Sequence, residues 1–340
     1  MRLLSPGPSG WMRAGAVVVV GGLLAACAAV VPPTPSGHAA PSIMPSLAPA
    51  GAVVRTLTLQ QHLLGVLDMV AEDGSVWVTA SDSPHGWLLR FDAASGRQLA
   101  KVPVGWAPTG LLIDGNQAWV ADSVGDGSLT GADQNQVEVI DGATGAVRHR
   151  YAIELPMAVA GLGDAVWVLS SGGQQSTLRR LDPDGPPALT LPGAGARQLV
   201  AAGHQLWTAT WNAAGGTDLW GIDPHASEVP KPLAIPGQVR ALVSDGDRLY
   251  AIDSSSINVV SQIDLDSGKA LASSSPFDGL QAVAAGNGVV WVAAAGQLHR
   301  LSDRLEEEAA PISVGEGVSA MAVDKNVWLA TQQGLVEVEP

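Results

Sequence analysis

The sequence predicts an all-β fold, a seven-bladed β-propeller built from four-stranded blades. Seven times, a short apolar run, a polar turn and a second apolar run centred on an aromatic residue follow one another. The repeat recurs at intervals of roughly 40 residues, which is the length that a four-stranded blade needs. An indole at one repeating position buries a large apolar area, so we expect these aromatics in the core. They are Trp77, Trp119, Trp167, Trp207, Tyr250, Trp291 and Trp328.

The first repeat shows how one blade is built. Its first strand is mostly apolar, which suits burial near the propeller axis, and its last strand interleaves polar and apolar residues because one face is wet. Asp73-Gly74 supplies the tight turn between the first two strands. The repeat therefore predicts four strands, over residues 68–71, 76–79, 87–91 and 98–104.

An Asp-x-x-x-Gly segment recurs before the outer strand of several repeats. Aspartate accepts hydrogen bonds from nearby backbone N–H groups, and glycine tolerates a positive φ, so the segment suits a turn. Aspartates of this kind also invite interpretation as metal ligands, but they lack companion ligands, and we therefore predict turns. The segments are Asp92–Gly96, Asp141–Gly145 and Asp264–Gly268.

The two ends of the repeat region complement each other. The last repeat has three expected strands, over residues 321–323, 327–330 and 335–338, and its outer strand is missing. The alternating, β-branched segment Val53–Leu59 precedes the first blade and has no blade of its own. If it supplies the missing strand, neither segment leaves an unpaired edge. We therefore predict that residues 52–340 form one ring, closed by the N-terminal strand of the domain.

The first 26 residues have the features of an export signal. Arg2 and Arg13 provide positive charge, an apolar stretch covers residues 14–24, and Met12 is an alternative start. The segment ends in Leu24-Ala25-Ala26-Cys27, which resembles the lipobox of bacterial lipoproteins. That resemblance implies that Cys27, the single cysteine, is acylated and becomes the mature N-terminus. We therefore expect a protein anchored by lipid to the cell membrane, on its extracytoplasmic side.

Residues 27–51 predict a tether between the lipid and the domain. They are rich in Ala, Pro and Ser and carry no charge, and the prolines prevent helix and sheet. The whole chain has a formal net charge of −14, with 32 acidic and 18 basic residues. This balance argues against binding to nucleic acid and against adhesion of the domain to anionic lipid. We expect a monomer.

Short motifs within the repeats point to a known superfamily. Val76-Trp77-Val78, Val166-Trp167-Val168 and Val290-Trp291-Val292 resemble the Val-Trp-Val repeats of YVTN and streptogramin-lyase-like propellers. The segment Val104–Gly110, ahead of a strand, does so too. The resemblance covers residues 52–340. It implies the propeller fold rather than a particular activity, because the repeat residues are structural in every blade.

Loop lengths suggest where a ligand would bind. The expected connections between second and third strands are long in the first four blades, at residues 81–86, 122–136, 170–176 and 210–218, and short in the last two. Such loops on a rigid scaffold commonly carry binding sites. Asp122, Asp126 and Asp133 offer oxygen ligands for a cation, but their spacing matches no calcium loop, so we assign no metal or cofactor. The candidate ligand-binding residues are His85, Trp106, Asp122, Asp126, Arg197 and Trp211.

Two classes of function fit these features. The first is an envelope module that binds a protein, a peptide or another envelope ligand without converting it. The alternative is a lyase or hydrolase acting on a small molecule at the propeller mouth, because the resemblance to streptogramin lyases implies histidines and a glutamate near a magnesium ion. His85 and Glu316 could share a face, but a single such pair is not a catalytic constellation. We therefore assign no catalytic residue and expect a binding module.

Overall fold

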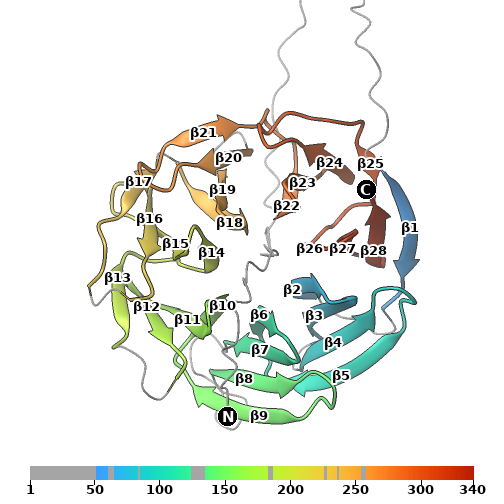
Figure 1. Ribbon diagram of the computed structural model, residues 1–340, viewed down its shortest axis with the longest axis horizontal. Coiled ribbons are helices and arrows are strands. Elements are labelled where there is room, and N and C mark those ends of the chain that lie inside the picture. Colours follow the sequence, from blue (N-terminus) through green and yellow to red (C-terminus); the bar gives the residue numbers. More distant parts are fainter. Residues whose placement is uncertain are drawn as a thin grey trace, which may run out of the picture.

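The computed structural model describes residues 51–59, 65–82, 85–123, 135–182, 187–225, 228–235, 237–253 and 258–340. These residues form seven four-stranded antiparallel sheets arranged in a ring (Figure 1). The predicted seven-bladed β-propeller is therefore confirmed. The expected signal peptide, Cys27 and the tether up to residue 50 lie outside the described residues.

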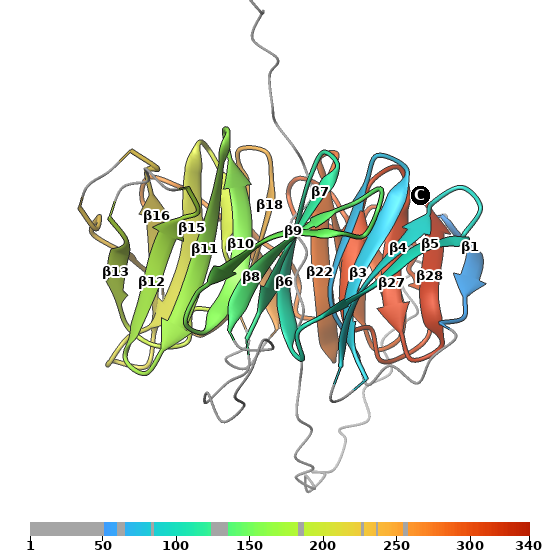
Figure 2. The same cartoon turned by 90° about the horizontal axis from the view of Figure 1, so that it is seen from below.

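Strands of equal rank occupy equal places in the ring (Figures 1 and 2). The inner strands are β2 (Gly65–Glu72), β6 (Pro108–Asp114), β10 (Pro156–Leu162), β14 (Val200–Ala202), β18 (Val239–Asp245), β22 (Leu280–Gly286) and β26 (Ala320–Val323). The second strands are β3 (Ser75–Ser81), β7 (Gln117–Asp122), β11 (Ala165–Gly172), β15 (Gln205–Trp211), β19 (Arg248–Asp253), β23 (Val289–Ala294) and β27 (Val327–Thr331). The third strands are β4 (Gly86–Asp92), β8 (Gln136–Asp141), β12 (Gln175–Arg180), β16 (Thr217–Ile222), β20 (Val259–Ile263), β24 (Gln297–Leu301) and β28 (Gly334–Glu339). The outer strands are β5 (Gln98–Val104), β9 (Val147–Ala152), β13 (Leu189–Pro192), β17 (Leu233–Ile235), β21 (Ala270–Ser273), β25 (Ile312–Ser313) and β1 (Ala52–Leu57).

The strand β1 joins the two ends of the domain. It pairs antiparallel with β28, with Arg55 opposite Glu337 and Leu57 opposite Leu335. The last sheet thus has the order β1-β28-β27-β26, so its outer strand comes from the start of the domain. The alternation of Val53–Leu59 fits this place, because an outer strand has one face on the blade and one in water.

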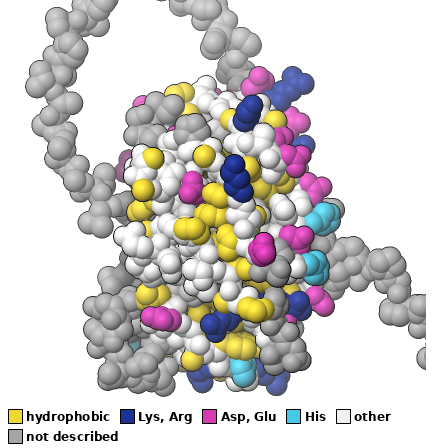
Figure 3. Space-filling model, turned by 90° about the vertical axis from the view of Figure 1, so that its left-hand side faces the viewer, with side chains coloured by type: hydrophobic (Ala, Val, Ile, Leu, Met, Phe, Trp, Pro, Cys, Tyr) yellow, Lys and Arg dark blue, Asp and Glu magenta, His cyan; other side chains and the backbone are white. Residues whose placement is uncertain are grey.

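The hydrophobic core lies between neighbouring sheets. Six of the seven repeat aromatics are at most 4% exposed. Trp119 is the exception: it is half-buried and stacks on Tyr151 of the outer strand β9, with ring centroids 6.1 Å apart. Figure 3 shows the rim on the side of β13 and β17, where apolar side chains lie across the middle and Asp, Glu and His gather toward one face.

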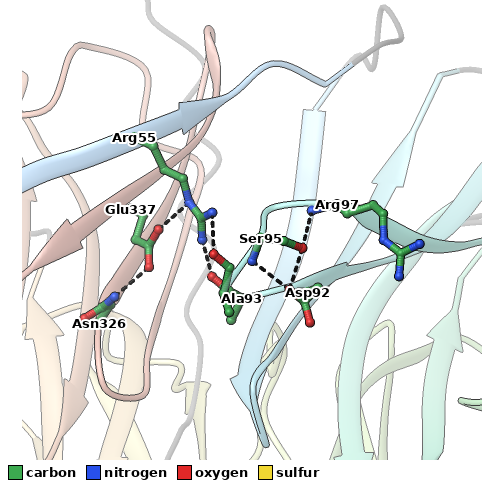
Figure 4. A network of polar contacts seen from close by, with 8 residues as sticks. Arg55, Asp92, Ala93, Ser95, Arg97, Asn326 and Glu337 are labelled. Carbon is green, nitrogen blue, oxygen red and sulfur yellow. Dashed lines mark hydrogen bonds and ion pairs between the residues drawn. The ribbon is translucent and has the colours of Figure 1, made fainter.

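Two arginines, Arg90 and Arg55, each connect their own blade to the following blade in the ring. The guanidinium of Arg90 lies 4.7 Å from the ring centroid of Trp77, and its Nη1 donates to the carbonyl of Gly142 in the following blade, at 2.9 Å. Gly142 has to be a glycine, since a Cβ there would lie 2.8 Å from Cη2 of Trp77. Arg55 repeats the arrangement over Trp328 and donates to the carbonyls of Ala93 and Ala94 in the first blade (Figure 4). The position of one arginine therefore sets the spacing between two blades.

The Asp-x-x-x-Gly segments are turns, as predicted. In each, Oδ1 of the aspartate accepts the N–H of the residue three positions later, at 2.7 or 2.8 Å. The glycines Gly96, Gly145 and Gly268 all have φ of 71°. Hydrogen bonds lower the pKa of the three aspartates, chiefly those from the hydroxyls of Ser95 and Ser267 for Asp92 and Asp264, and from Arg148 for Asp141.

One expected loop is a tight turn. Residues 170–176 were expected to form a long connection, but β11 and β12 continue through them, with Ser171 opposite Ser176 and Gly172 opposite Gln175. Only Gly173 and Gln174 lie between the strands, and Gly173 supplies a φ of 61°. The polar composition of this segment was misleading, because backbone pairing at a sheet end needs no apolar side chain. Of the fourth expected loop, residues 212–216 remain outside the strands.

Candidate functional site

The propeller has two faces, which we name by their connections. The loop face consists of the connections from second to third strands and from each outer strand to the next inner strand. The turn face consists of the remaining connections. Five of the six candidate residues are described, and all five lie on the loop face; Asp126 lies outside the described residues.

Trp211 and the segment that leads to Arg197 are held together in the fourth blade. The Trp211 N–H donates to the carbonyl of Ala194 at 2.8 Å, and a Cβ on Gly195 would lie 3.0 Å from the indole. Gly195 has φ +79°, which a residue with a side chain would rarely adopt. The indole nevertheless remains 50% exposed. The Trp211 indole is therefore held against the segment 194–195, which leads to Arg197.

Asp122 has a different role from the one expected of a surface ligand. It is fully buried, and its Oδ1 accepts the N–H of Ala107 at 2.8 Å. A Cβ on Gly105 would overlap the Asp122 carboxylate, so the missing side chain of Gly105 makes the room. Asp122 thus positions the connection between β5 and β6, which carries the half-buried Trp106.

His85 directly precedes β4, whose first residue Gly86 pairs with Val104 at the start of the connection that carries Trp106. It is an exposed residue of the first blade, and its Nδ1 lies 3.5 Å from Oδ1 of Asp82. The other carboxylate oxygen of Asp82 accepts the indole N–H of Trp87 at 2.9 Å. Lys101 covers the Trp87 ring at 3.5 Å. The structure therefore places the described candidates in two groups: His85 and Asp122 lie beside the connection that carries Trp106, and Trp211 lies beside the segment that leads to Arg197.

The inner strands of the first five blades surround a channel with a volume of about 490 Å³. Its two mouths differ in charge. At the turn face, the inner turns contribute the acidic residues Glu72, Asp114, Asp164 and Asp247 together with His204. At the loop face, the wall includes Leu67, Thr109, Met157, Arg197 and Arg240. The channel thus has an acidic mouth and a mouth with two arginines.

Arg240 was not among the candidates from the sequence. It is half-buried in β18, its Nη2 donates to the carbonyl of Leu280 at 2.8 Å, and burial lowers its pKa. Its Nε is buried and finds no hydrogen-bond partner among the described residues. A regularity in the sequence could have revealed it: Arg197 and Arg240 precede the repeat aromatics Trp207 and Tyr250 by the same number of residues.

Polar side chains around the channel join successive inner strands. Asp68 Oδ2 accepts the Leu111 N–H at 2.8 Å, and burial raises the pKa of Asp68 to about 7. Gln198 Oε1 accepts the Leu242 N–H at 2.6 Å, and Gln281 Oε1 accepts the Val318 N–H at 3.3 Å. With the hydrogen bonds from Thr109 to Pro156 and from Arg240 to Leu280, five junctions between blades are joined near the axis. Side-chain hydrogen bonds therefore cross-link the inner strands at five of the seven junctions between blades.

Among the described channel residues, Asp68 has a pKa of about 7, in the range that suits a general acid or base, but its two carboxylate oxygens already accept the N–H groups of Met69 and Leu111. The closest contact between a histidine and an acid joins His299 Nδ1 and Glu307 Oε1, 2.6 Å apart, on β24 and the connection that follows it. Neither residue lines the channel. Within the described ranges, no three His, Cys, Asp or Glu side chains are grouped so that they could hold a metal ion. The same ranges contain no helix of the length and apolar character that would cross a membrane.

Comparison with known proteins supports the architecture. No protein-family model matches the chain. No curated protein matches it significantly. Among solved structures, it is similar to a chain of the hydrazine synthase of Kuenenia stuttgartiensis, with a TM-score of 0.67 and 13% identity over 83% of this chain and 97% of that one. It is also similar to BamB from Moraxella catarrhalis, with a TM-score of 0.52 and 19% identity over 81% of each chain. At these identities the likeness establishes the fold: the chain is a β-propeller.

Proposed function

We propose that this protein is a lipid-anchored module of the bacterial cell envelope that binds a protein or peptide through the loop face of its propeller. The proposal rests on one observation: the Trp211 side chain is exposed, yet it is held in place by packing on Gly195. Trp211 keeps half of its surface in water although it packs on Gly195, next to the arginine-bearing mouth of the channel. Trp and Arg are the side chains that most often dominate binding energy.

The cross-linking of the inner strands favours binding by several weak contacts. The hydrogen bonds between inner strands and the carboxylate of Asp122 hold the loop segments at fixed mutual distances. A partner that touches Trp106 and Trp211 together therefore meets groups that are already ordered. The cost of immobilising them on binding is correspondingly small.

Cys27 and the uncharged tether complete the proposal. The signal peptide would direct export, acylation of Cys27 would anchor the protein on the extracytoplasmic side of the membrane, and residues 28–51 would let the propeller reach a partner near the surface. The Val-Trp-Val repeats favour membership of the YVTN and streptogramin-lyase-like propellers. A lyase or hydrolase at the propeller mouth is the alternative. The location of the His299–Glu307 pair away from the channel favours binding over that alternative.

Site-specific photocrosslinking in intact membranes tests this proposal. A benzophenone amino acid is introduced at position 211 on the loop face and, as the matched control, at position 164 on the turn face, where the Asp164 side chain is 97% exposed. We expect a discrete crosslinked species from position 211 and none from position 164. Equal crosslinking from both positions, or none from position 211, would contradict the proposal.

A further inference from the structure

The arginines at the loop-face mouth lie on neighbouring walls of the channel. Arg197 precedes β14 in the fourth blade, and Arg240 lies in β18 of the fifth. Gln198, the residue after Arg197, bonds the N–H of Leu242, two positions after Arg240. Both arginines line the cavity. Two cationic side chains thus border the same space from adjacent blades.

Neither arginine is neutralised by a carboxylate of the described residues. Arg197 is exposed and makes no hydrogen bond or ion pair with them. Arg240 is half-buried, and its contact there is a backbone carbonyl, that of Leu280. Burying a guanidinium without a counter-charge costs free energy. The buried Nε, without a partner in the same described set, adds to that cost. An anion from outside the chain would offset it.

The rest of the mouth limits what kind of anion fits. Leu67 and Met157 present apolar walls, and the Thr109 hydroxyl already donates to the carbonyl of Pro156. Few donors remain for the many oxygens of a phosphate, whereas a carboxylate needs only the edges of the two guanidinium groups. The chain is acidic overall, with a net charge of −14, which disfavours polyanions more than a single negative charge. A volume of about 490 Å³ is within the range of sites for small ligands.

We propose that the loop-face mouth of the channel binds a carboxylate attached to an apolar group, with Arg197 and Arg240 holding the carboxylate and Leu67 and Met157 contacting the apolar part. The inference deepens the proposed function and rests on it for the class of partner, because the free end of a peptide has this chemistry. A small amphipathic carboxylic acid has it too. The acidic mouth at the turn face repels such a group, so the carboxylate enters from the loop face.

Calorimetric titration of the full chain in detergent tests the site with defined probes. They are the tripeptide acetyl-Ala-Ala-Leu as the free acid, the same tripeptide as its C-terminal amide, and acetyl-leucine. We expect the tripeptide acid to bind at least about tenfold more tightly than the amide, which is the loss expected for one charge-assisted contact. If acetyl-leucine binds as tightly as the tripeptide acid, the natural ligand is a small carboxylic acid. If acetyl-leucine binds more weakly than the tripeptide acid, the natural ligand is the C-terminal end of a peptide.

Variants locate the contact. Arg240→Gln should lower the affinity for the tripeptide acid about tenfold and leave that for the amide unchanged. Arg197→Gln provides the same test with an exposed side chain whose loss does not disturb packing, and Arg148→Gln, on the outer strand β9, is the control. Equal affinity for acid and amide, full affinity in both arginine variants, or no binding of the acid at millimolar concentration would overturn the inference. Crosslinking from position 211 that persists in such a case would leave the proposed function intact.

Discussion

Arg55 Nε and Glu337 Oε2 lie 2.5 Å apart and connect the first strand of the domain to the last (Figure 4). Glu337 is 5% exposed and also accepts a hydrogen bond from the side chain of Asn326, at 2.6 Å. Arg55 continues to the carbonyls of Ala93 and Ala94 in the first blade. Arg55 of β1 thus contacts the third strand of the last blade through an ion pair and the first blade through hydrogen bonds.

Replacing Arg55 by alanine should destabilise the propeller by about 2–4 kcal/mol, because it leaves the buried Glu337 carboxylate without its cation. Urea unfolding followed by tryptophan fluorescence measures the change. Arg148→Ala is the matched control, since its ion pair with Asp141 is at the surface, and it should have no measurable effect. An Arg55→Ala protein as stable as the control variant would show that ring closure does not depend on this pair.

Deleting residues 52–59 should destabilise the whole domain, whereas deleting residues 28–48 should leave its stability unchanged. The first deletion removes β1 and exposes the edge of β28, and the second shortens only the expected tether. Thermal unfolding by circular dichroism compares the two proteins. Equal melting temperatures would contradict the role assigned to β1.

Asp68 should make stability depend on pH. Its folded-state pKa of about 7 lies above the ordinary value of 3.8, so the protonated form is favoured in the fold. This contribution is complete below about pH 4 and is lost as the pH rises through about 7. We expect Asp68→Asn to remove a difference on the order of 2 kcal/mol between the unfolding free energies at pH 5 and pH 8. An identical pH dependence in both proteins would show that Asp68 is ionised throughout.

Cys27→Ser should release the protein from the membrane fraction while the propeller stays folded. The thiol is the acceptor that the Leu24-Ala25-Ala26-Cys27 motif requires, and a serine hydroxyl does not replace it. Fractionation of cells, followed by immunoblotting and a melting curve of the released protein, gives both readouts. Membrane retention of the serine variant at the level of the original protein would argue against lipid anchoring.

Much of the fold could be predicted from the sequence because a propeller repeats one local pattern. The aromatic of the second strand is buried between sheets in six of the seven blades, and the turn of Asp92–Gly96 is specified by its own hydrogen bonds. The prediction of a long connection at residues 170–176 is wrong. Strand ends pair through the backbone, so polar residues there do not predict a loop.

The candidate site was only partly predictable. Arg197 and Trp211 lie close to connections whose sequence identifies them as loops, and the structure brings their segments together. The burial of Asp122 depends on the missing side chain of Gly105, a contact between elements that residue types alone do not reveal. Arg240 lies in β18 directly before the apolar run Ala241–Val243, and it shares the channel wall with Arg197, which comes from the neighbouring blade.

We propose that the loop face binds a partner through Trp211, and measuring binding and stability in one variant tests this directly. Trp211→Ala removes a side chain that is already 50% exposed, so we expect the melting temperature to change little. Crosslinking of the partner in intact membranes, with the benzophenone at position 106, should fall about tenfold in this variant, as for the loss of an aromatic hot spot. Undiminished crosslinking in a stable Trp211→Ala protein would show that Trp211 does not contribute to partner binding.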